Sequence, residues 1–186
     1  MRESTEETLQ IVRSILDAYT DHPTATKITV KEVPGGCYWQ LKVHPDDYGK
    51  VNGRKGQHIR ALTALVVQLG EAAHETYQFV LVEPDAGQRM PSRERPVATE
   101  YDPSQAVELL EWTVSAALDI DCDVESTRFL IASDRPTFTL WIKAPQPEAA
   151  ILTKPDNGST LLEAMQILWH ARAQKEGVAL RLELAP

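Results

Sequence analysis

The chain has 186 residues, of which 42% are hydrophobic, so it is long enough to bury a core as one large domain or two small ones. It carries 19 basic and 27 acidic residues, a net charge of −8, which excludes a uniformly basic surface and requires any nucleic-acid site to be local. Cys37 and Cys122 are too few for a disulfide scaffold and lack the paired spacing of a zinc site, which favours a reducing compartment. A polar N-terminus and the lack of any apolar run near the roughly 20 residues of a membrane span predict a soluble cytoplasmic protein.

The first 83 residues predict the order helix, strand, strand, short helix, long helix, strand. Ser4 and Glu7 fit a capping box, and the helix that follows should end near 21–23. Its apolar stripe is formed by residues at three-and-four spacing: Leu9, Val12, Ile15, Leu16 and Tyr19. Alternating apolar residues at 28–30 and 37–43, around a proline-glycine turn at 33–36, then predict a hairpin.

The rest of this half predicts two helices and a strand. Pro45 suits the first position of a short helix that runs to about Val51, and Gly53 should stop it. A long helix should start at Gly56 or Gln57 and loosen at Gly70. Its buried stripe is expected to be Ile59, Leu62, Leu65, Val66 and Leu69. A strand at 77–82 completes the unit.

The same order recurs after a proline-rich segment of mixed charge at 84–101, which is typical of a linker. Asp102 to Gln105 predict a capped helix, strands are expected around Phe129–Ile131 and 138–142, and Pro147 should restart a short helix. A long helix with Leu161, Leu162, Met165, Leu168 and Trp169 and a strand at 178–184 follow. Residues in matching places are separated by 101 or 102 positions, which indicates duplication: Lys42 and Lys143, Pro45 and Pro147, Gly56 and Gly158.

The segment 49–60, between the two helices of the first half, contains the candidate ligand-binding residues. It contains the pattern G-R-K-G at Gly53–Gly56, where glycines let the backbone approach a phosphate and the start of the second helix favours an anion. No acidic residue occurs from Tyr48 to Gly70, whereas four basic residues do. This window is therefore locally cationic in an acidic chain. An ordinary helix-to-helix turn is the alternative interpretation.

With this motif and its flanking elements, residues 4–83 resemble a type II KH domain, of the kind found in the small single-domain KhpA-like RNA-binding proteins. Those proteins carry a segment similar to P-D-D-x-G-K-V-I-G-K-x-G-x-x-I-x-A-I, and this chain has P-D-D-Y-G-K-V-N-G-R-K-G-Q-H-I-R-A-L. The resemblance implies an α+β protein of two tandem KH-like domains (α-β-β-α-α-β), each a three-stranded sheet packed on helices. The domains are expected at 1–83 and 102–186, the second being a degenerate copy.

The resemblance also implies a groove for about four unpaired nucleotides, clamped by the glycine loop. The expected RNA-binding residues are Lys50, Val51, Asn52, Gly53, Arg54, Lys55, Gly56, His58, Ile59 and Arg60. Asn52 replaces an apolar residue of the family pattern, and either loses an apolar contact or gains a hydrogen bond to a base. Implied partners are small or messenger RNAs and a larger KH-containing protein, with the repeats pairing within one chain or in a homodimer.

The loop of the second half, Thr153–Gly158, lacks G-x-x-G, and Pro155 and Asp156 disfavour a phosphate there. The second repeat is therefore expected to be structural or to bind a partner. The alternative function for the whole chain is a protein-protein interaction scaffold without RNA binding, favoured by the net charge of −8. No acid-base or nucleophile constellation suggests an enzyme, and neither a cofactor nor a metal is expected, because the five histidines show no ligand spacing. The acidic residues between Asp119 and Glu125 are expected in a solvated loop.

Overall fold

The structure is a computed structural model in which residues 3–84, 101–129, 136–146, 148–156 and 159–185 are described. The chain divides into two compact units, residues 1–93 and 94–186. Most of the expected linker, 85–100, lies outside the described residues. The described residues form a mixed α+β protein with six α-helices and two three-stranded sheets, which is compatible with KH-like domains.

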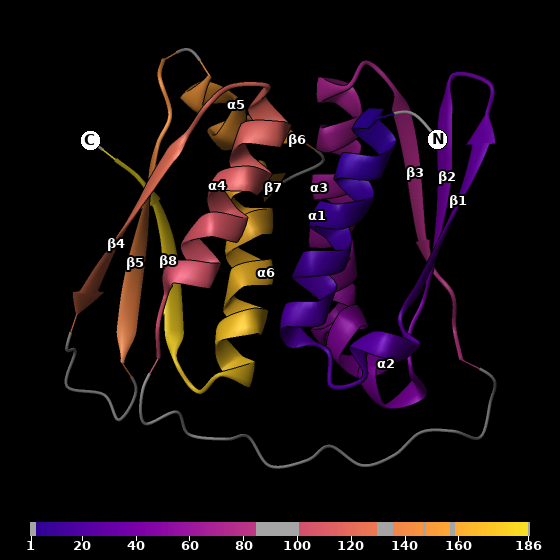
Figure 1. Ribbon diagram of the computed structural model, residues 1–186, viewed down its shortest axis with the longest axis horizontal. Helices are drawn as coiled ribbons and strands as arrows, with labels where there is room; N and C mark the ends of the chain where they lie inside the picture. Colours follow the sequence, from indigo (N-terminus) through magenta and orange to yellow (C-terminus); the bar gives the residue numbers. More distant parts are fainter. Residues whose placement is uncertain (1–2, 85–100, 130–135, 147, 157–158, 186) are drawn as a thin grey trace. The chain divides into compact units, whose positions relative to one another are not determined.

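The first unit has the element order that the hydrophobic periodicity predicts. It consists of α1 (Glu3–Tyr19), β1 (Lys27–Val33), β2 (Gly36–Lys42), α2 (Pro45–Asn52), α3 (Gln57–Ala72) and β3 (Thr76–Leu81). The central strand β2 pairs antiparallel with β1 and parallel with β3, so that Trp39 lies between Val30 and Phe79 (Figure 1). The predicted hairpin turn is confirmed at Pro34 and Gly35.

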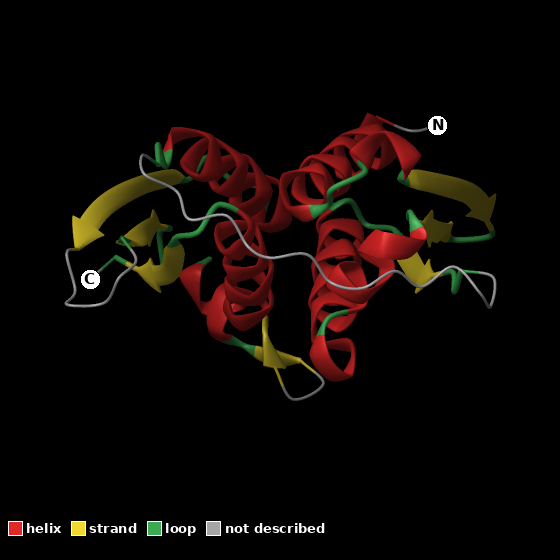
Figure 2. Cartoon of the chain, turned by 90° about the horizontal axis from the view of Figure 1, so that it is seen from below, coloured by secondary structure: helices red, strands yellow, loops and turns green. Residues whose placement is uncertain are grey.

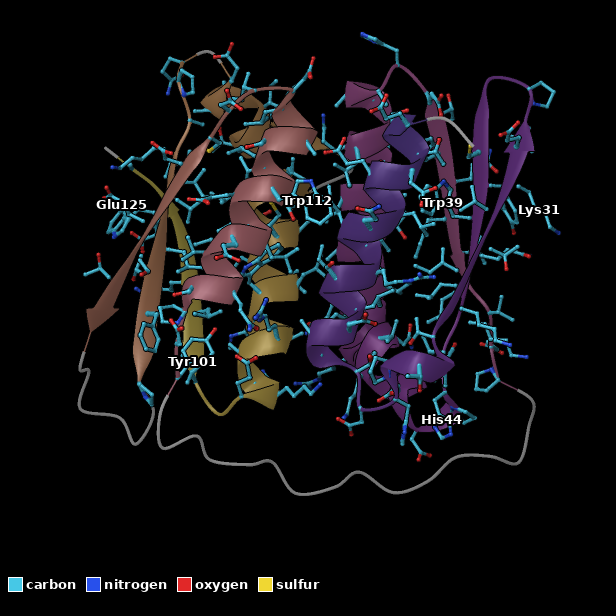
Figure 3. All side chains as sticks on the ribbon, viewed as in Figure 1. Lys31, Trp39, His44, Tyr101, Trp112 and Glu125 are labelled. Atoms are coloured by element: carbon cyan, nitrogen blue, oxygen red, sulfur yellow. The ribbon has the colours of Figure 1, made fainter. Side chains whose placement is uncertain are left out.

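The core of the first unit lies between its sheet and its helices. Within each unit the helices lie on one side of the sheet (Figure 2). Trp39 is fully buried toward the helices, whereas Lys31, on β1, points away from them (Figure 3). The helices contribute buried residues at three-and-four spacing, each stabilising the fold by about 1.5–3 kcal/mol when fully buried: Ile11, Val12, Ile15, Leu16, Leu62, Leu65, Val66 and Leu69.

Four sequence expectations for the first unit are wrong in detail. Ile59, predicted in the buried stripe of α3, is only half-buried, because it lies in the first turn of the helix next to the exposed loop. Ser4 lies inside α1 rather than at its cap, because the helix already includes Glu3. Leu9 is only half-buried, since the buried stripe runs through Thr5 and Thr8 instead. Gly70 does not loosen α3, which continues to Ala72. Gly70 is buried where a Cβ would lie 2.8 Å from the Tyr77 ring, so its role is to allow close packing.

The second unit repeats the strand pairing of the first. It contains α4 (Ser104–Leu118), β4 (Asp123–Phe129), β5 (Thr137–Lys143), α5 (Ala149–Thr153), β6 (Pro155–Asp156), β7 (Ser159–Thr160), α6 (Leu161–Lys175) and β8 (Ala179–Leu184). β5 is antiparallel to β4 and parallel to β8. The Asp102 carboxylate accepts hydrogen bonds from the Ser104 amide (3.0 Å) and hydroxyl (2.6 Å), although the residue at the N-cap of α4 is Pro103 rather than the predicted Asp102. These bonds lower the pKa of Asp102.

The second unit also departs from the expected pattern. Strand β4 begins at Asp123, so Asp123 and Glu125 lie in a strand rather than in a loop. Cross-strand pairing explains this placement, because Glu125 forms an ion pair with Lys143 of β5. The small hairpin β6–β7 and the capping box of α6, formed by Thr160 and Glu163, were not predicted. Ile131, Pro147 and Gly158 lie outside the described residues.

In the described part of the chain, none of the helices combines the length and the apolarity that crossing a membrane would require.

Candidate nucleic-acid interface

The predicted glycine loop joins α2 to α3. Helix α2 ends at Gly53, whose amide donates to the Gly49 carbonyl at 2.9 Å. Residues Arg54–Gly56 form one 3₁₀ turn, η2, closed by a 3.1 Å hydrogen bond from the Gly56 amide to the Gly53 carbonyl. Helix α3 then begins at Gln57. The loop is therefore a sharp turn with a defined backbone, placed between two helix ends.

Both glycines of the loop are required by its shape. Gly53 has φ 70° and Gly56 has φ 75°, a region that side chains disfavour. A Cβ on Gly53 would also lie 2.6 Å from the His58 ring, which is too close for any real contact. Lys55, between them, has φ 55° and ψ 27°, so the tip holds a non-glycine residue in a left-handed conformation. Such a residue stores about 1 kcal/mol of strain.

Two main-chain amides at the tip of the loop are available to a ligand. The amides of Gly53, Gly56 and Gln57 are used within the turn, the last by the Arg54 carbonyl. For the amides of Arg54 and Lys55, no protein acceptor is found among the described residues. Both residues are exposed. Neighbouring free amides on a turn form a site for an anion.

His58 supports the loop from the first turn of α3. Its Nδ1 donates to the Lys50 carbonyl at 2.6 Å, and its Nε2 lies 3.3 Å from the Gln57 side-chain nitrogen Nε2, from which it can accept. The ring packs edge-on to Tyr19, at 6.3 Å between centroids. Burial raises the pKa of the Tyr19 phenol, so this ring stays neutral. His58 thus ties the end of α2 to α1 and α3.

Arg60 supports the other side of the loop. Its Nη1 donates to the Lys55 carbonyl at 2.6 Å, and the same atom would lie 3.2 Å from a Cβ on Gly56. The Asn52 side-chain oxygen lies on the same side, 3.7 Å from that Cβ position. No hydrogen bond is found for the Asn52 side chain in the described part of the chain, so its amide can still bind a ligand.

The charges of this segment do not all face a ligand. Lys50 forms an ion pair with Asp21 and lies 3.9 Å from Asp47, so its charge is largely compensated. Arg54, Lys55 and Arg60 have no carboxylate partner among the residues the structure describes. The effective positive charge of the loop therefore comes from three side chains rather than four.

The two aliphatic residues of the predicted site differ in burial. Val51 has no exposed surface and belongs to the core beneath the loop, whereas Ile59 is half-buried and reaches the surface. Only Ile59 can therefore offer an apolar contact to a ligand without a rearrangement of the core.

A buried carboxylate beneath the loop was missed by the sequence analysis. Asp47 is fully buried and accepts hydrogen bonds from the Asp21 amide at 2.9 Å and the His22 amide at 2.8 Å. It thereby fixes the chain after α1 against α2, the helix that ends in the loop. Its position in the first turn of α2 predicts only a favourable charge, because its partners lie 25 and 26 residues earlier.

The corresponding place in the second unit has different geometry. Pro155–Asp156 pair with Ser159–Thr160 in the hairpin β6–β7, whose residues 157 and 158 lie outside the described part. Pro155 offers no amide hydrogen. The described backbone there is extended rather than a turn that presents amides.

Comparisons with known proteins give related sequences for part of the chain. No family profile matches it. The RNA-binding protein KhpA of Streptomyces coelicolor is 36% identical over 61 residues, which cover 33% of this chain and 77% of that protein. The KhpA of Leifsonia xyli is 33% identical over 57 residues (31% and 75%), and that of Listeria monocytogenes is 27% identical over 74 residues (40% and 97%).

The fold and the loop define a protein with small α+β units, one of which presents a cationic glycine turn. The sequence similarity to the KhpA proteins identifies the family. The chain belongs to the KhpA family, on the basis of a match that covers about three quarters of several members and about a third of this chain.

Proposed function

We propose that this protein binds single-stranded RNA through the loop Gly53–Gly56 of its first unit. The observation that carries the proposal is the pair of amides at the exposed residues Arg54 and Lys55, which have no protein acceptor among the described residues. The two cationic side chains of this turn also have no acidic partner there. The family relationship supports it, because the KhpA relatives are named RNA-binding proteins. The resemblance of residues 4–83 to a type II KH domain gives the expected mode of binding.

In this proposal the residues of the segment have distinct tasks. The backbone of the loop and the side chains of Arg54 and Lys55 hold the phosphates of about four unpaired nucleotides. Gly53 and Gly56 give the turn its shape, and His58 and Arg60 hold it from α3. Arg60 keeps its charge while it donates to the Lys55 carbonyl, so it also attracts the RNA backbone.

The remaining predicted residues lie at the edge of the site or below it. Ile59 offers an apolar contact to a base, and Asn52 a hydrogen bond. Lys50 contributes chiefly through its carbonyl, which accepts from His58, and Val51 through the core. We expect modest sequence selectivity, since most contacts reach the backbone of the RNA.

For the second unit we propose a degenerate KH-like repeat that does not clamp RNA. It shares the strand pairing of the first unit, and its loop position holds Pro155 in a hairpin. Its role would be structural, or it would bind a partner such as a larger KH-containing protein. Pairing of the repeats, homodimerisation, a cytoplasmic location and the lack of catalysis belong to the same proposal.

A protein-interaction scaffold is the second candidate function, favoured by the net charge of −8. The test is binding of the full chain to a pool of random single-stranded RNA, compared with the double variant Arg54→Asp, Lys55→Asp. The RNA proposal expects the folded variant to lose binding, because the reversed charges repel phosphate at the free amides. A folded variant that retains full affinity would refute the loop assignment, and a wild-type chain that binds no RNA would favour the scaffold.

A further inference from the structure

Three side chains that are separate in the sequence converge beside α2. They are His22, which follows α1, His44, which precedes α2 and is labelled in Figure 3, and Asp46 in the first turn of α2. One potential ligand atom from each lies within 4.8 Å of the others. We call this group the His-His-Asp cluster. Among the described residues, it is the only set of three histidine, cysteine or acidic side chains with such convergence.

The distances in the His-His-Asp cluster are close to those of a metal site. The Asp46 Oδ2 lies 3.6 Å from the His22 Nε2 and 3.7 Å from the His44 Nδ1. A tetrahedral zinc ion with ligands at about 2.0–2.1 Å requires ligand atoms about 3.3–3.4 Å apart. Two of the three separations therefore need to shorten by only a few tenths of an ångström. The third, between the nitrogens of the two half-buried imidazoles, is at most 4.8 Å and would shorten by rotation of the rings.

The nitrogen of His44 already has the protonation that a metal requires. His44 Nδ1 accepts a hydrogen bond from the Asp46 amide at 3.3 Å, so it carries a lone pair rather than a hydrogen. That bond is long, which makes it easy to exchange for a metal-ligand bond. The His22 and His44 rings are in contact, with centroids 4.1 Å apart and ring planes tilted by 45°.

The backbone beneath the cluster is held in place by the fold. The His22 amide donates to the buried Asp47 carboxylate at 2.8 Å, and Pro45 follows His44 at the start of α2. The three ligand side chains thus project from two segments that Asp47 already joins. Preorganised backbone lowers the entropy that a site loses when it binds an ion.

We propose that His22, His44 and Asp46 bind a divalent transition-metal ion, zinc in the first place, with water completing the coordination. Two imidazole nitrogens and one carboxylate oxygen favour zinc and its neighbours over magnesium or calcium, which prefer oxygen ligands alone. Bound metal would fasten the start of α2 to the segment after α1. Because α2 ends at Gly53, the ion would stabilise the helix that carries the RNA-binding loop proposed above, although binding of the ion does not depend on that function.

The test is titration of the full-length, chelator-treated protein with zinc chloride by calorimetry, together with Co²⁺ absorption, which reports the coordination geometry. The expected result is one ion per chain and a rise in the thermal unfolding midpoint. His22→Ala, His44→Ala and Asp46→Asn should each weaken zinc binding by more than about tenfold. A loss of about tenfold is already usual when a residue that only hydrogen-bonds to a metal ligand is replaced. His74→Asn is the matched control: this exposed histidine lies outside the cluster, and its φ of 57° is one that asparagine tolerates.

Circular dichroism of each variant establishes that it is folded, and the Co²⁺ spectrum of a folded variant then decides between the outcomes. Loss of binding in the cluster variants and not in His74→Asn supports the site. Absence of zinc binding by the wild-type chain would overturn the proposal and leave the cluster as a group of neighbouring polar side chains. Binding that survives in folded His22→Ala and His44→Ala would also overturn it, because the ion would then lie elsewhere.

Discussion

The salt dependence of RNA binding is the most informative test of the loop, because it counts the cations that contact phosphate. The perturbation is the double substitution Arg54→Ala, Lys55→Ala, which removes both exposed charges and keeps Gly53 and Gly56. Neither side chain has a hydrogen bond or an ion pair within the described residues, so the substitution removes no polar side-chain interaction that the structure shows. Its effect on binding should therefore come from the lost phosphate contacts.

The magnitude follows from the three uncompensated cations of the loop, Arg54, Lys55 and Arg60. With a slope of about −0.7 per neutralised phosphate of a single strand, log affinity should fall with log salt at about −2.1 for the wild type and about −0.7 for the variant. Between 50 and 200 mM salt the wild type should then lose roughly 18-fold in affinity and the variant roughly 3-fold. Lys50 is left out of this count, because Asp21 compensates its charge.

The assay is fluorescence anisotropy with a labelled single-stranded RNA over a series of salt concentrations. The control is Lys27→Ala, Lys31→Ala, which removes two exposed lysines of β1 from the sheet face opposite the helices. The control should leave the slope unchanged, while the loop variant should reduce it to about a third. Equal slopes for the wild type and the folded loop variant would refute the assignment of phosphate contacts to Arg54 and Lys55.

Three further predictions concern stability, and urea unfolding followed by tryptophan fluorescence measures each. Gly36→Ala should destabilise the fold by about 3 kcal/mol or more, because its Cβ would lie 1.8 Å from the Thr76 carbonyl oxygen. The control Gly49→Ala meets no atom within 4 Å and should stabilise α2 by about 0.5–1 kcal/mol. Equal effects of the two substitutions would contradict the packing seen at β2. His58→Ala should cost about 1–2 kcal/mol through its lost hydrogen bond and also weaken RNA binding, so a variant of unchanged stability would argue against its supporting role. Lys55→Gly should raise stability by about 1 kcal/mol and weaken RNA binding, and a loss of stability would show that the left-handed conformation is not strained.

The elements of both units could be predicted because their signals are local. Alternation placed Trp39 and Leu41 on the buried face of β2, and three-and-four spacing placed Leu62 and Leu65 on the buried face of α3. The failures have long-range causes. Gly70 was expected to end a helix, and only the position of the Tyr77 ring shows why a glycine inside α3 is needed. The start of β4 was missed because polar residues at that end are held by pairing with β5.

In the candidate site, too, local features could be predicted from the sequence and long-range contacts could not. The motif located the loop, and its glycines alone predict a turn at Gly53 and Gly56. The pairing of Lys50 with Asp21, the contact of His58 with Tyr19 and the convergence of the His-His-Asp cluster join residues more than 20 positions apart. No spacing rule predicts such pairs, so neither the convergence of the two histidines nor the compensation of the Lys50 charge by Asp21 could be predicted from the sequence.

The two side chains that hold the loop from α3 have a consequence for experiments on dynamics. His58 and Arg60 hold the loop by donating hydrogen bonds to the carbonyls of Lys50 and Lys55. The amide protons of Arg54 and Lys55 should therefore exchange rapidly with deuterium although the backbone around them is held still, and RNA should slow that exchange. At this turn, fast deuterium uptake would indicate amides that lack a hydrogen-bond acceptor and can bind a ligand, rather than motion of the chain.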